Sequence, residues 1–132
     1  MAFARRLALP LDCRVDMPRR ARLPVDRLFR AFSDRTRLRI LHLLSTGEVC
    51  VNDLVSSLRL PQPTVSRHLS YLKRSGLVTT RRESSWIYYA LAEARSPFHA
   101  KLLDCLSSCF ADVPELARDS ARAQKKAARP CC

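Results

Sequence analysis

Hydrophobic residues in the first half of the chain recur at three- and four-residue steps, the spacing of one face of an α-helix. A first helix is predicted from Pro24, and a second over "DRTRLRILHLL", with Ser33 as its N-terminal cap and Gly47 as its end. In the second helix we expect the aliphatic residues to be buried and the arginines to lie mostly outside. The first apolar face consists of Val25, Leu28, Phe29 and Phe32; the second helix buries Leu38, Ile40, Leu41, Leu43 and Leu44 and exposes Arg35, Arg37 and Arg39.

The next two segments carry the signals of two short helices joined by a tight turn. A short extended piece, "EVCV", leads into a helix over "NDLVSSLRL", which Asn52 or Asp53 would cap. Another helix follows in "PQPTVSRHLSYLKRSGLV", because proline is tolerated in a first helical turn and Gly76 suits the end. Two helices joined in this way form a helix-turn-helix.

The segment after the helix-turn-helix changes to a strand pattern. "LVTTRRESSWIYYAL" contains two β-rich runs separated by a polar "ESS", which predicts a β-hairpin. A last helix begins with Ser96 as its cap and Pro97 at its first position, and we expect it to continue to about Ala111. The predicted fold class is therefore mainly α with a small β-hairpin, a winged helix-turn-helix.

The charge balance narrows the choice of partners. The chain has 24 Lys and Arg against 12 Asp and Glu, a formal net charge of +12, which favours nucleic acid, and an anionic membrane only second. The longest apolar run near the N-terminus, "LALPL", is too short for a secretory signal, and no stretch approaches a membrane span. We therefore expect a cytoplasmic protein with a nucleic-acid partner and no membrane partner.

Residues 61–82 contain basic side chains and no acid, so the second helix of the helix-turn-helix and the first strand would present positive charge to phosphates. Side chains early in such a helix reach base edges in the major groove. The arginines in the hairpin are expected to position the DNA backbone. The predicted base readers are Gln62, Thr64, Ser66 and Arg67, and the predicted wing contacts are Arg81 and Arg82; His68 is better explained as a packed, hydrogen-bonded residue.

The chain divides into three parts by composition. Residues 1–23 carry six Arg and no sustained period, which predicts a disordered basic arm, and Met17 is an alternative start. Residues 24–112 would form the DNA-binding and dimerisation domain. Residues 113–132 are expected to form a basic tail that ends in a cysteine pair, in which Pro114 either breaks the preceding helix or opens another.

Two apolar segments have no obvious partner inside a single winged helix. These are the helix faces over residues 24–32 and 97–110. Pairing them across a two-fold axis would bury both faces and would present two recognition helices to a pseudo-palindromic site. The sequence thus predicts a homodimer on double-stranded DNA.

Six cysteines in a basic chain of this kind do not fit a secreted disulfide scaffold, so we interpret them as thiols. Cys105 and Cys109 stand four residues apart on one helix, with side chains roughly 6 Å apart, close enough to hold one soft ion such as Zn(II) or Cu(I). Either one alone is better explained as a small buried hydrophobe. The exposed vicinal pair Cys131 and Cys132 changes that balance, because a polar tail offers it no core.

The stretch from "AFSDRTRLRILHLL" to "SSWIYYAL" resembles the ArsR/SmtB family of metal- and metalloid-sensing repressors over roughly residues 25–110. The resemblance rests on the Ser-Asp-x-Thr-Arg start, the "QPTVSRHL" recognition helix, the "KRSGLV" exit and the two wing tyrosines, in the right order. Such proteins are homodimers that bind operator DNA and release it when a metal or related inducer binds. The resemblance implies trivalent arsenic or antimony, held by three sulfurs, as the inducer, with no permanent cofactor.

The sequence departs from that family in two places. Arg59 and Pro61 stand where its members commonly have Gly and Ser, which should alter the entry to the recognition helix slightly. Arsenic-sensing members often have Cys-Val-Cys-Asp-Leu-Cys where this chain has "CVNDLV", so only Cys50 of that triad is present. The predicted thiol ligands are, in order, Cys105 with Cys109, Cys131 with Cys132, and Cys50; Cys13 ranks last.

Three classes of function remain open from the sequence. The first is a repressor released by a metalloid or another soft ion. The second is a repressor of the same fold that senses thiol oxidation or persulfides. The third is a DNA-compacting protein with little sequence specificity. An enzyme is not expected, because no paired acid and base, nucleophile elbow or phosphate loop is present.

Overall fold

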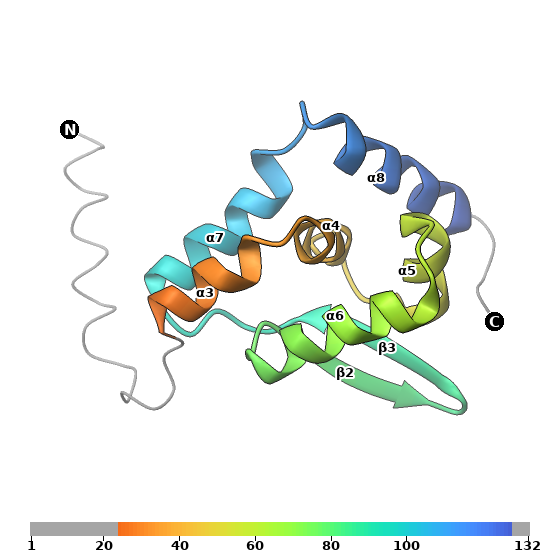
Figure 1. Ribbon diagram of the computed structural model, residues 1–132, viewed down its shortest axis with the longest axis horizontal. Helices are drawn as coiled ribbons and strands as arrows, with labels where there is room; N and C mark the ends of the chain where they lie inside the picture. Colours follow the sequence, from red (N-terminus) through yellow and green to blue (C-terminus); the bar gives the residue numbers. More distant parts are fainter. Residues whose placement is uncertain (1–23, 128–132) are drawn as a thin grey trace.

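The computed structural model describes residues 24–127, which form six helices and a three-stranded sheet (Figure 1). The predicted basic arm over residues 1–23 and the pair Cys131 and Cys132 lie outside the described residues. None of the helices in the described range is long and apolar enough to cross a membrane. The helices are α3 (Val25–Phe32), α4 (Arg35–Leu44), α5 (Val51–Leu58), α6 (Gln62–Arg74), α7 (Pro97–Ser108) and α8 (Pro114–Ala127).

The first two helices follow the predicted periodicity, but their junction differs from the prediction. The cap of α4 is Asp34, whose carboxylate accepts a hydrogen bond from the Arg37 backbone N–H at 2.9 Å. Ser33, which the sequence suggested, instead ends α3, and its hydroxyl donates to the Arg30 carbonyl at 2.8 Å. An aspartate beside the serine is an equally good cap, so composition could not choose between them.

Helices α5 and α6 form the predicted helix-turn-helix. The N-terminal cap of α5 is Cys50, whose side chain makes no capping hydrogen bond, so the predicted cap at Asn52 or Asp53 is wrong. Helix α6 begins after Pro61, which has extended backbone, and carries a second proline in its first turn, as expected. The turn between the helices places Arg59 in the left-handed region, at φ 54° and ψ 45°.

The wing is the predicted hairpin with one added strand. Strands β2 (Val78–Glu83) and β3 (Trp86–Leu91) pair in antiparallel register, from Val78 opposite Leu91 to Glu83 opposite Trp86. Strand β1 (Val49–Cys50) pairs with the other edge of β3, so that the sheet order is β1-β3-β2. The extended piece before α5 therefore fixes the wing to the start of the helix-turn-helix.

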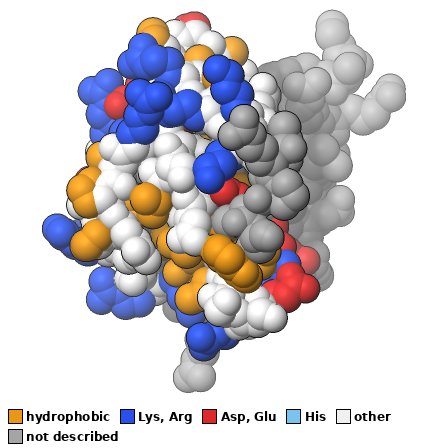
Figure 2. Space-filling model, turned by 90° about the vertical axis from the view of Figure 1, so that its right-hand side faces the viewer, with side chains coloured by type: hydrophobic (Ala, Val, Ile, Leu, Met, Phe, Trp, Pro, Cys, Tyr) orange, Lys and Arg blue, Asp and Glu red, His pale blue; other side chains and the backbone are white. Residues whose placement is uncertain are grey.

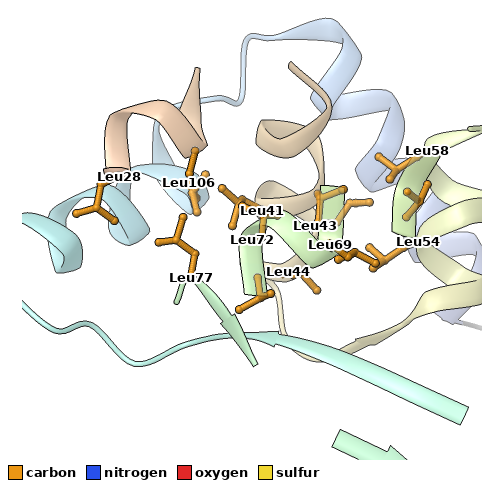
Figure 3. Packing of buried hydrophobic residues seen from close by; sticks show 14 residues of the cluster. Leu28, Leu41, Leu43, Leu44, Leu54, Leu58, Leu69, Leu72, Leu77 and Leu106 are labelled. Atoms are coloured by element: carbon orange, nitrogen blue, oxygen red, sulfur yellow. The ribbon is translucent and has the colours of Figure 1, made fainter. Parts of the chain in front are cut away.

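The core is built almost entirely from leucine side chains that meet around α4 (Figure 3). Leu41, Leu43 and Leu44 of α4 are buried, and so are Leu54 and Leu58 of α5. The α6 stripe packs against them, as the sequence predicted. The other leucines labelled in the core lie outside α4 and α5; they are Leu28, Leu69, Leu72, Leu77 and Leu106.

Residues 114–127 differ from the predicted tail, because they form a helix that packs on the domain. Helix α8 lies across α4 and α5 (Figure 1) and buries Leu116 and Asp119 completely or nearly so. Arg39, expected mostly outside, is 9% exposed because it pairs with Asp119. Pro114 is the first residue of α8, so the second of its two predicted alternatives, the start of a further helix, is confirmed.

The substitution Arg59→Gly is expected to raise the free energy of unfolding by about 1 kcal/mol, because a residue with a Cβ pays a steric cost in the left-handed region that glycine avoids. Urea denaturation measures the change. The matched control is Ser56→Gly in the exposed interior of α5, which should lower stability by about 0.5–1 kcal/mol. If Arg59→Gly lowered the free energy of unfolding as much as Ser56→Gly does, the contacts of the Arg59 side chain would stabilise the fold by more than its left-handed backbone costs.

Candidate nucleic-acid interface and thiol sites

One face of the recognition helix α6 is polar, and the opposite face of the helix packs in the core. Val65, Leu69 and Leu72 are buried, which orients the helix. Gln62 and Arg67 are exposed, and Thr64 and Ser66 are half-buried at the borders of the face. The four predicted base readers thus lie on the first two turns of one helix, where a major groove would receive them.

Two further residues extend this face: Ser70, which sequence analysis missed, and Arg74, which belongs to the acid-free basic stretch but was not predicted as a base reader. Ser70 and Arg74 are exposed and follow Arg67 at three- and four-residue steps. His68 lies on the protected side, half-buried, with its Nδ1 3.7 Å from the Asp34 carboxylate. This position agrees with a packed histidine rather than a base reader.

The two wing arginines have different surroundings. Arg81 donates to the Glu48 carboxylate at 2.7 and 3.0 Å and to Glu83 at 3.2 Å, and its guanidinium lies 4.7 Å from the centre of the Tyr88 ring. The hydrogen bond to Glu48 is the main reason why the pKa of Arg81 is raised. The charge of Arg81 is therefore balanced by neighbouring carboxylates, and Arg81 links β2 to Glu48, the residue before β1.

Arg82 is the wing cation available to a partner. It is exposed, stands opposite Ile87 in the hairpin, and forms no ion pair among the described residues. Figure 2, seen from the end where α5 and α8 lie, shows Lys and Arg side chains in several groups that outnumber the acidic ones. On this face of the molecule the positive charge is spread over several groups and is not gathered in one patch.

The cysteine pair of α7 is brought together as predicted. Cys105 is half-buried near the end of the helix, and Cys109 is the exposed residue that caps it, its N–H bonded to the Cys105 carbonyl at 2.9 Å. A hydrogen bond between the two side chains raises the pKa of the Cys105 thiol, with smaller contributions from burial and from Asp104. Both sulfurs therefore face the same space as thiols.

Cys50 lies in a different part of the molecule. It is 2% exposed and lines a pocket of about 360 Å³ between the end of α4, the start of α5, β3 and α8. The pocket is bordered by Thr46, Gly47, Glu48, Asp53, Tyr88, Ser120, Ala123 and Gln124. Within residues 24–127, no three Cys, His, Asp or Glu side chains are grouped so as to hold a metal ion. Any thiol site must therefore recruit a ligand from beyond this range or from another subunit.

A buried ionic cluster joins α8 to the helix-turn-helix, and no pattern in the sequence predicted it. Asp119 is fully buried and accepts from Arg39 at 2.7 and 2.9 Å and from Arg122 at 2.5 Å. The same two arginines also donate to the carbonyls of Leu58 and Ser57, at 2.8 and 2.6 Å. These carbonyls lie at the end of α5, so the cluster satisfies the acceptors that the turn leaves without helical partners.

An apolar surface remains uncovered on α3 and α7. Val25 is 51% and Phe29 56% exposed, and the Phe29 ring lies 5.3 Å from that of Phe98. Large exposed apolar side chains in a cluster typically mark an association surface. This surface joins the two segments that the sequence left without partners. His99, next to Phe98, is fully buried, and burial lowers its pKa, so its ring is neutral.

Comparison with known proteins agrees with this geometry. The family model described as bacterial regulatory protein, arsR family, matches residues 34–80. The arsenical resistance operon repressor of Escherichia coli K12 is 40% identical over 102 residues, which cover 76% of this chain and 86% of that protein.

Two solved structures are similar in fold and sequence. The homodimeric winged helix-turn-helix DNA-binding domain from Mycobacterium bovis has a TM-score of 0.54 and 34% identity, covering 62% of this chain and 73% of that one. The cadmium metal sensor CMTR from Mycobacterium tuberculosis has a TM-score of 0.52 and 36% identity, covering 68% and 86%. The predicted winged helix-turn-helix is thereby confirmed.

Proposed function

This chain belongs to the ArsR family of bacterial regulatory proteins, and on that premise we propose that it is a repressor that binds double-stranded operator DNA and is released by trivalent arsenic or antimony. The observation that carries the proposal is a pair of adjacent thiols, Cys105 and Cys109, on a helix beside an uncovered apolar surface. The family consists of DNA-binding regulators, so the protein is not an enzyme.

DNA binding is assigned to α6 and the wing. Arg67 lies on the exposed face of the first two turns, where a guanidinium reads guanine through two hydrogen bonds. Arg82 contacts a phosphate and carries no sequence information. Arg81, held by Glu48, keeps the wing in position for Arg82.

Arg67→Ala is expected to weaken binding by roughly 1–3 kcal/mol on the cognate operator and to relax discrimination at one base pair. Arg82→Ala should weaken binding to all DNA sequences alike and reduce the slope of log affinity against log salt concentration by about 1. Fluorescence anisotropy on the operator and on single-base variants, at several salt concentrations, separates the two. Lys101→Ala on α7 is the control and should change neither. A loss of discrimination of equal size from Arg67→Ala and Arg82→Ala would contradict the assignment.

A homodimer places two recognition helices on one operator. The uncovered surface of α3 and α7 is the proposed interface, because pairing it across a two-fold axis removes Val25 and Phe29 from water. The homodimeric relative from M. bovis supports this arrangement.

Phe29→Asp is expected to convert the dimer to a monomer, because it places a charge in the centre of the proposed apolar interface. Light scattering at micromolar concentration measures the mass of both proteins. Arg27→Asp, on the same helix and exposed, is the control that introduces the same aspartate side chain, and it should remain dimeric. A wild-type monomer, or a dimeric Phe29→Asp variant, would contradict the interface.

Trivalent arsenic suits neutral thiols. Arsenous acid exchanges its hydroxides for thiols: each As–O bond breaks, an As–S bond forms, and the thiol proton leaves with hydroxide as water. The Cys105 thiol, with its raised pKa, is in the protonated form that this exchange uses. A divalent ion would instead need thiolates. The relatives named as an arsenical resistance repressor and a cadmium sensor support a soft ion.

The same adjacency of Cys105 and Cys109 supports one alternative, a repressor that responds to an oxidant or a persulfide. The function is tested by a gel shift on the DNA upstream of the gene, with sodium arsenite in the presence of a reducing agent that does not bind arsenic. Release of the protein from DNA under these conditions supports a metalloid inducer. Release only by an oxidant or persulfide, with a matching change in protein mass (a loss of two hydrogens for a disulfide, a gain of oxygen or sulfur for a sulfenic acid or persulfide), supports the alternative.

A further inference from the structure

A pocket between α3 and the end of α6 is lined by three arginines. They are Arg27 and Arg30 of α3 and Arg74 of α6, and Tyr71 and Ser75 complete the wall on the α6 side. The pocket has a volume of about 380 Å³, within the range of natural ligand pockets. Arg27 and Arg30 have no role in base reading, in the wing or in the proposed dimer surface.

The positive charge of this pocket is mostly unbalanced. The acid that lines it is Asp26, which pairs with Arg30 at 3.9 Å, and both side chains are more than 70% exposed. Such an exposed pair contributes little binding energy. Arg27 and Arg74 form no ion pair among the described residues. Three guanidinium groups and one carboxylate leave a net charge of +2, which favours an anion.

Arg37 of α4 holds the two walls of the pocket together. Its guanidinium donates to the carbonyls of Arg30 and Ala31 at the end of α3, at 2.9 and 3.0 Å. The same group lies 4.1 Å from the centre of the Tyr71 ring, on the α6 side. The two walls are therefore fixed relative to each other before a ligand binds, which lowers the entropic cost of binding.

The pocket continues the recognition face toward the proposed dimer surface. Arg74 is the last residue of α6 and is exposed on the same face as Arg67 and Ser70. Figure 1 shows α6 running from α5 toward α3, and α3 carries the exposed Val25 and Phe29. In a dimer formed through that apolar surface, the pocket lies between the recognition helix and the two-fold axis. The DNA between the two half-sites passes this region.

We propose that the pocket binds a phosphate of the DNA backbone between the half-sites, through Arg27, Arg30 and Arg74. The site rests on the proposed function for its DNA partner and for the two-fold axis. Guanidinium groups bind phosphate oxygens through paired, charge-assisted hydrogen bonds. The contact carries no sequence information, and it sets the position of each recognition helix relative to the centre of the operator.

The first test removes charge from α3 and keeps the length of the side chains. Arg27→Gln/Arg30→Gln should lower operator affinity roughly fivefold at about 0.15 M salt and reduce the slope of log affinity against log salt concentration by about 1, because one phosphate contact is lost. Asp26→Asn should raise the affinity, because it removes the acid that lines the pocket. Arg118→Gln, exposed on α8, is the matched control and should change neither quantity. Fluorescence anisotropy measures the affinities, and light scattering checks that each variant is dimeric.

The second test neutralises the phosphates in place of the arginines. Methylphosphonate groups replace the phosphates between the half-sites, one position at a time. The wild-type protein should lose affinity roughly fivefold at the contacted position on each strand. The Arg27→Gln/Arg30→Gln variant should be insensitive to the replacement at that position. Equal losses in the wild type and the variant at every position would overturn the site.

The outcomes separate the site from the proposed function. Unchanged affinity and salt slope in the Arg27→Gln/Arg30→Gln variant, on an operator that the wild type binds tightly, overturn the site and leave the function standing. A wild-type protein that prefers no DNA sequence contradicts the proposed function, and the change in salt slope then tests the pocket on any duplex.

A free phosphate ion offers the same chemistry as the DNA backbone, so it is tested separately. Sodium phosphate replaces sodium chloride at constant ionic strength, and the melting temperature is measured without DNA. The DNA contact predicts the same small change in the wild type and in Arg27→Gln/Arg30→Gln. A rise in the melting temperature of the wild type that the variant lacks, together with unchanged operator affinity in the variant, would assign the pocket to a small anion and overturn the DNA contact.

Discussion

Asp119→Asn is expected to lower the free energy of unfolding by about 3 kcal/mol, because it leaves buried charges without their partner. Asp119 is fully buried and balances two arginines, Arg39 and Arg122. The amide keeps the shape but removes the charge, so that two guanidinium groups remain in a poorly solvated position. Of the carboxylates around Arg39, only Glu115 would remain near it, at 3.5 Å.

The loss is measured by urea denaturation followed by circular dichroism. Asp26→Asn is the matched control, because it breaks an ion pair with Arg30 in which both side chains are more than 70% exposed. That change should cost less than about 1 kcal/mol. Equal stability of both variants would show that Asp119 is replaceable and that α8 is held by its apolar contacts alone.

The same substitution should also reduce DNA affinity. Arg39 and Arg122 hold the carbonyls of Leu58 and Ser57, which directly precede the turn into α6. Without Asp119 these arginines lose their fixed orientation, and the turn that aims the recognition helix loosens. A loss of DNA affinity in this variant would show that helix α8 supports DNA binding through the turn into α6, to which Arg39 and Arg122 connect it.

The helix-turn-helix and the wing could be predicted from the sequence because their signals are local. Pro61, Pro63 and Gly76 bound α6, and the buried stripe of three aliphatic residues orients it. The "ESS" segment coincides with the hairpin turn after Glu83. Each of these signals acts over a few residues, where steric and hydrogen-bonding preferences decide the outcome.

Helix α8 could not be predicted as part of the domain, because its signal is not local. Its sequence is rich in charge, which is typical of an exposed tail. Its attachment depends on Arg39 and Asp119, which are 80 positions apart. A buried arginine and a buried aspartate look the same in a sequence as exposed ones, and only the fold brings them together.

The candidate site was predictable only in part, for the same reason. The spacing of Cys105 and Cys109 predicted that their thiols meet, and the structure places them together. The acid-free stretch suggested that both wing arginines face DNA, but Glu48, which lies outside that stretch, balances Arg81. Charge counted along a segment misses partners that arrive from another strand.

Cys105→Ser with Cys109→Ser should leave operator affinity near that of the wild type and abolish release by arsenite. The proposed DNA-binding residues lie on α6 and the wing, whereas Cys105 lies on α7 and Cys109 caps that helix, beside the proposed dimer surface. Capture of an ion there should shift α7 and change the separation of the two recognition helices. Release requires a coupling free energy of only about 1–3 kcal/mol, because the ion needs merely to bind the DNA-free state better.

The measurement is fluorescence anisotropy of the operator complex titrated with sodium arsenite and, separately, with an antimonite salt. The control is Cys13→Ser, whose complex should dissociate at the same arsenite concentration as the wild type. If the double variant is released normally, the α7 pair is not the switch. Cys50 with Cys131 and Cys132 would then be the better candidate for the site.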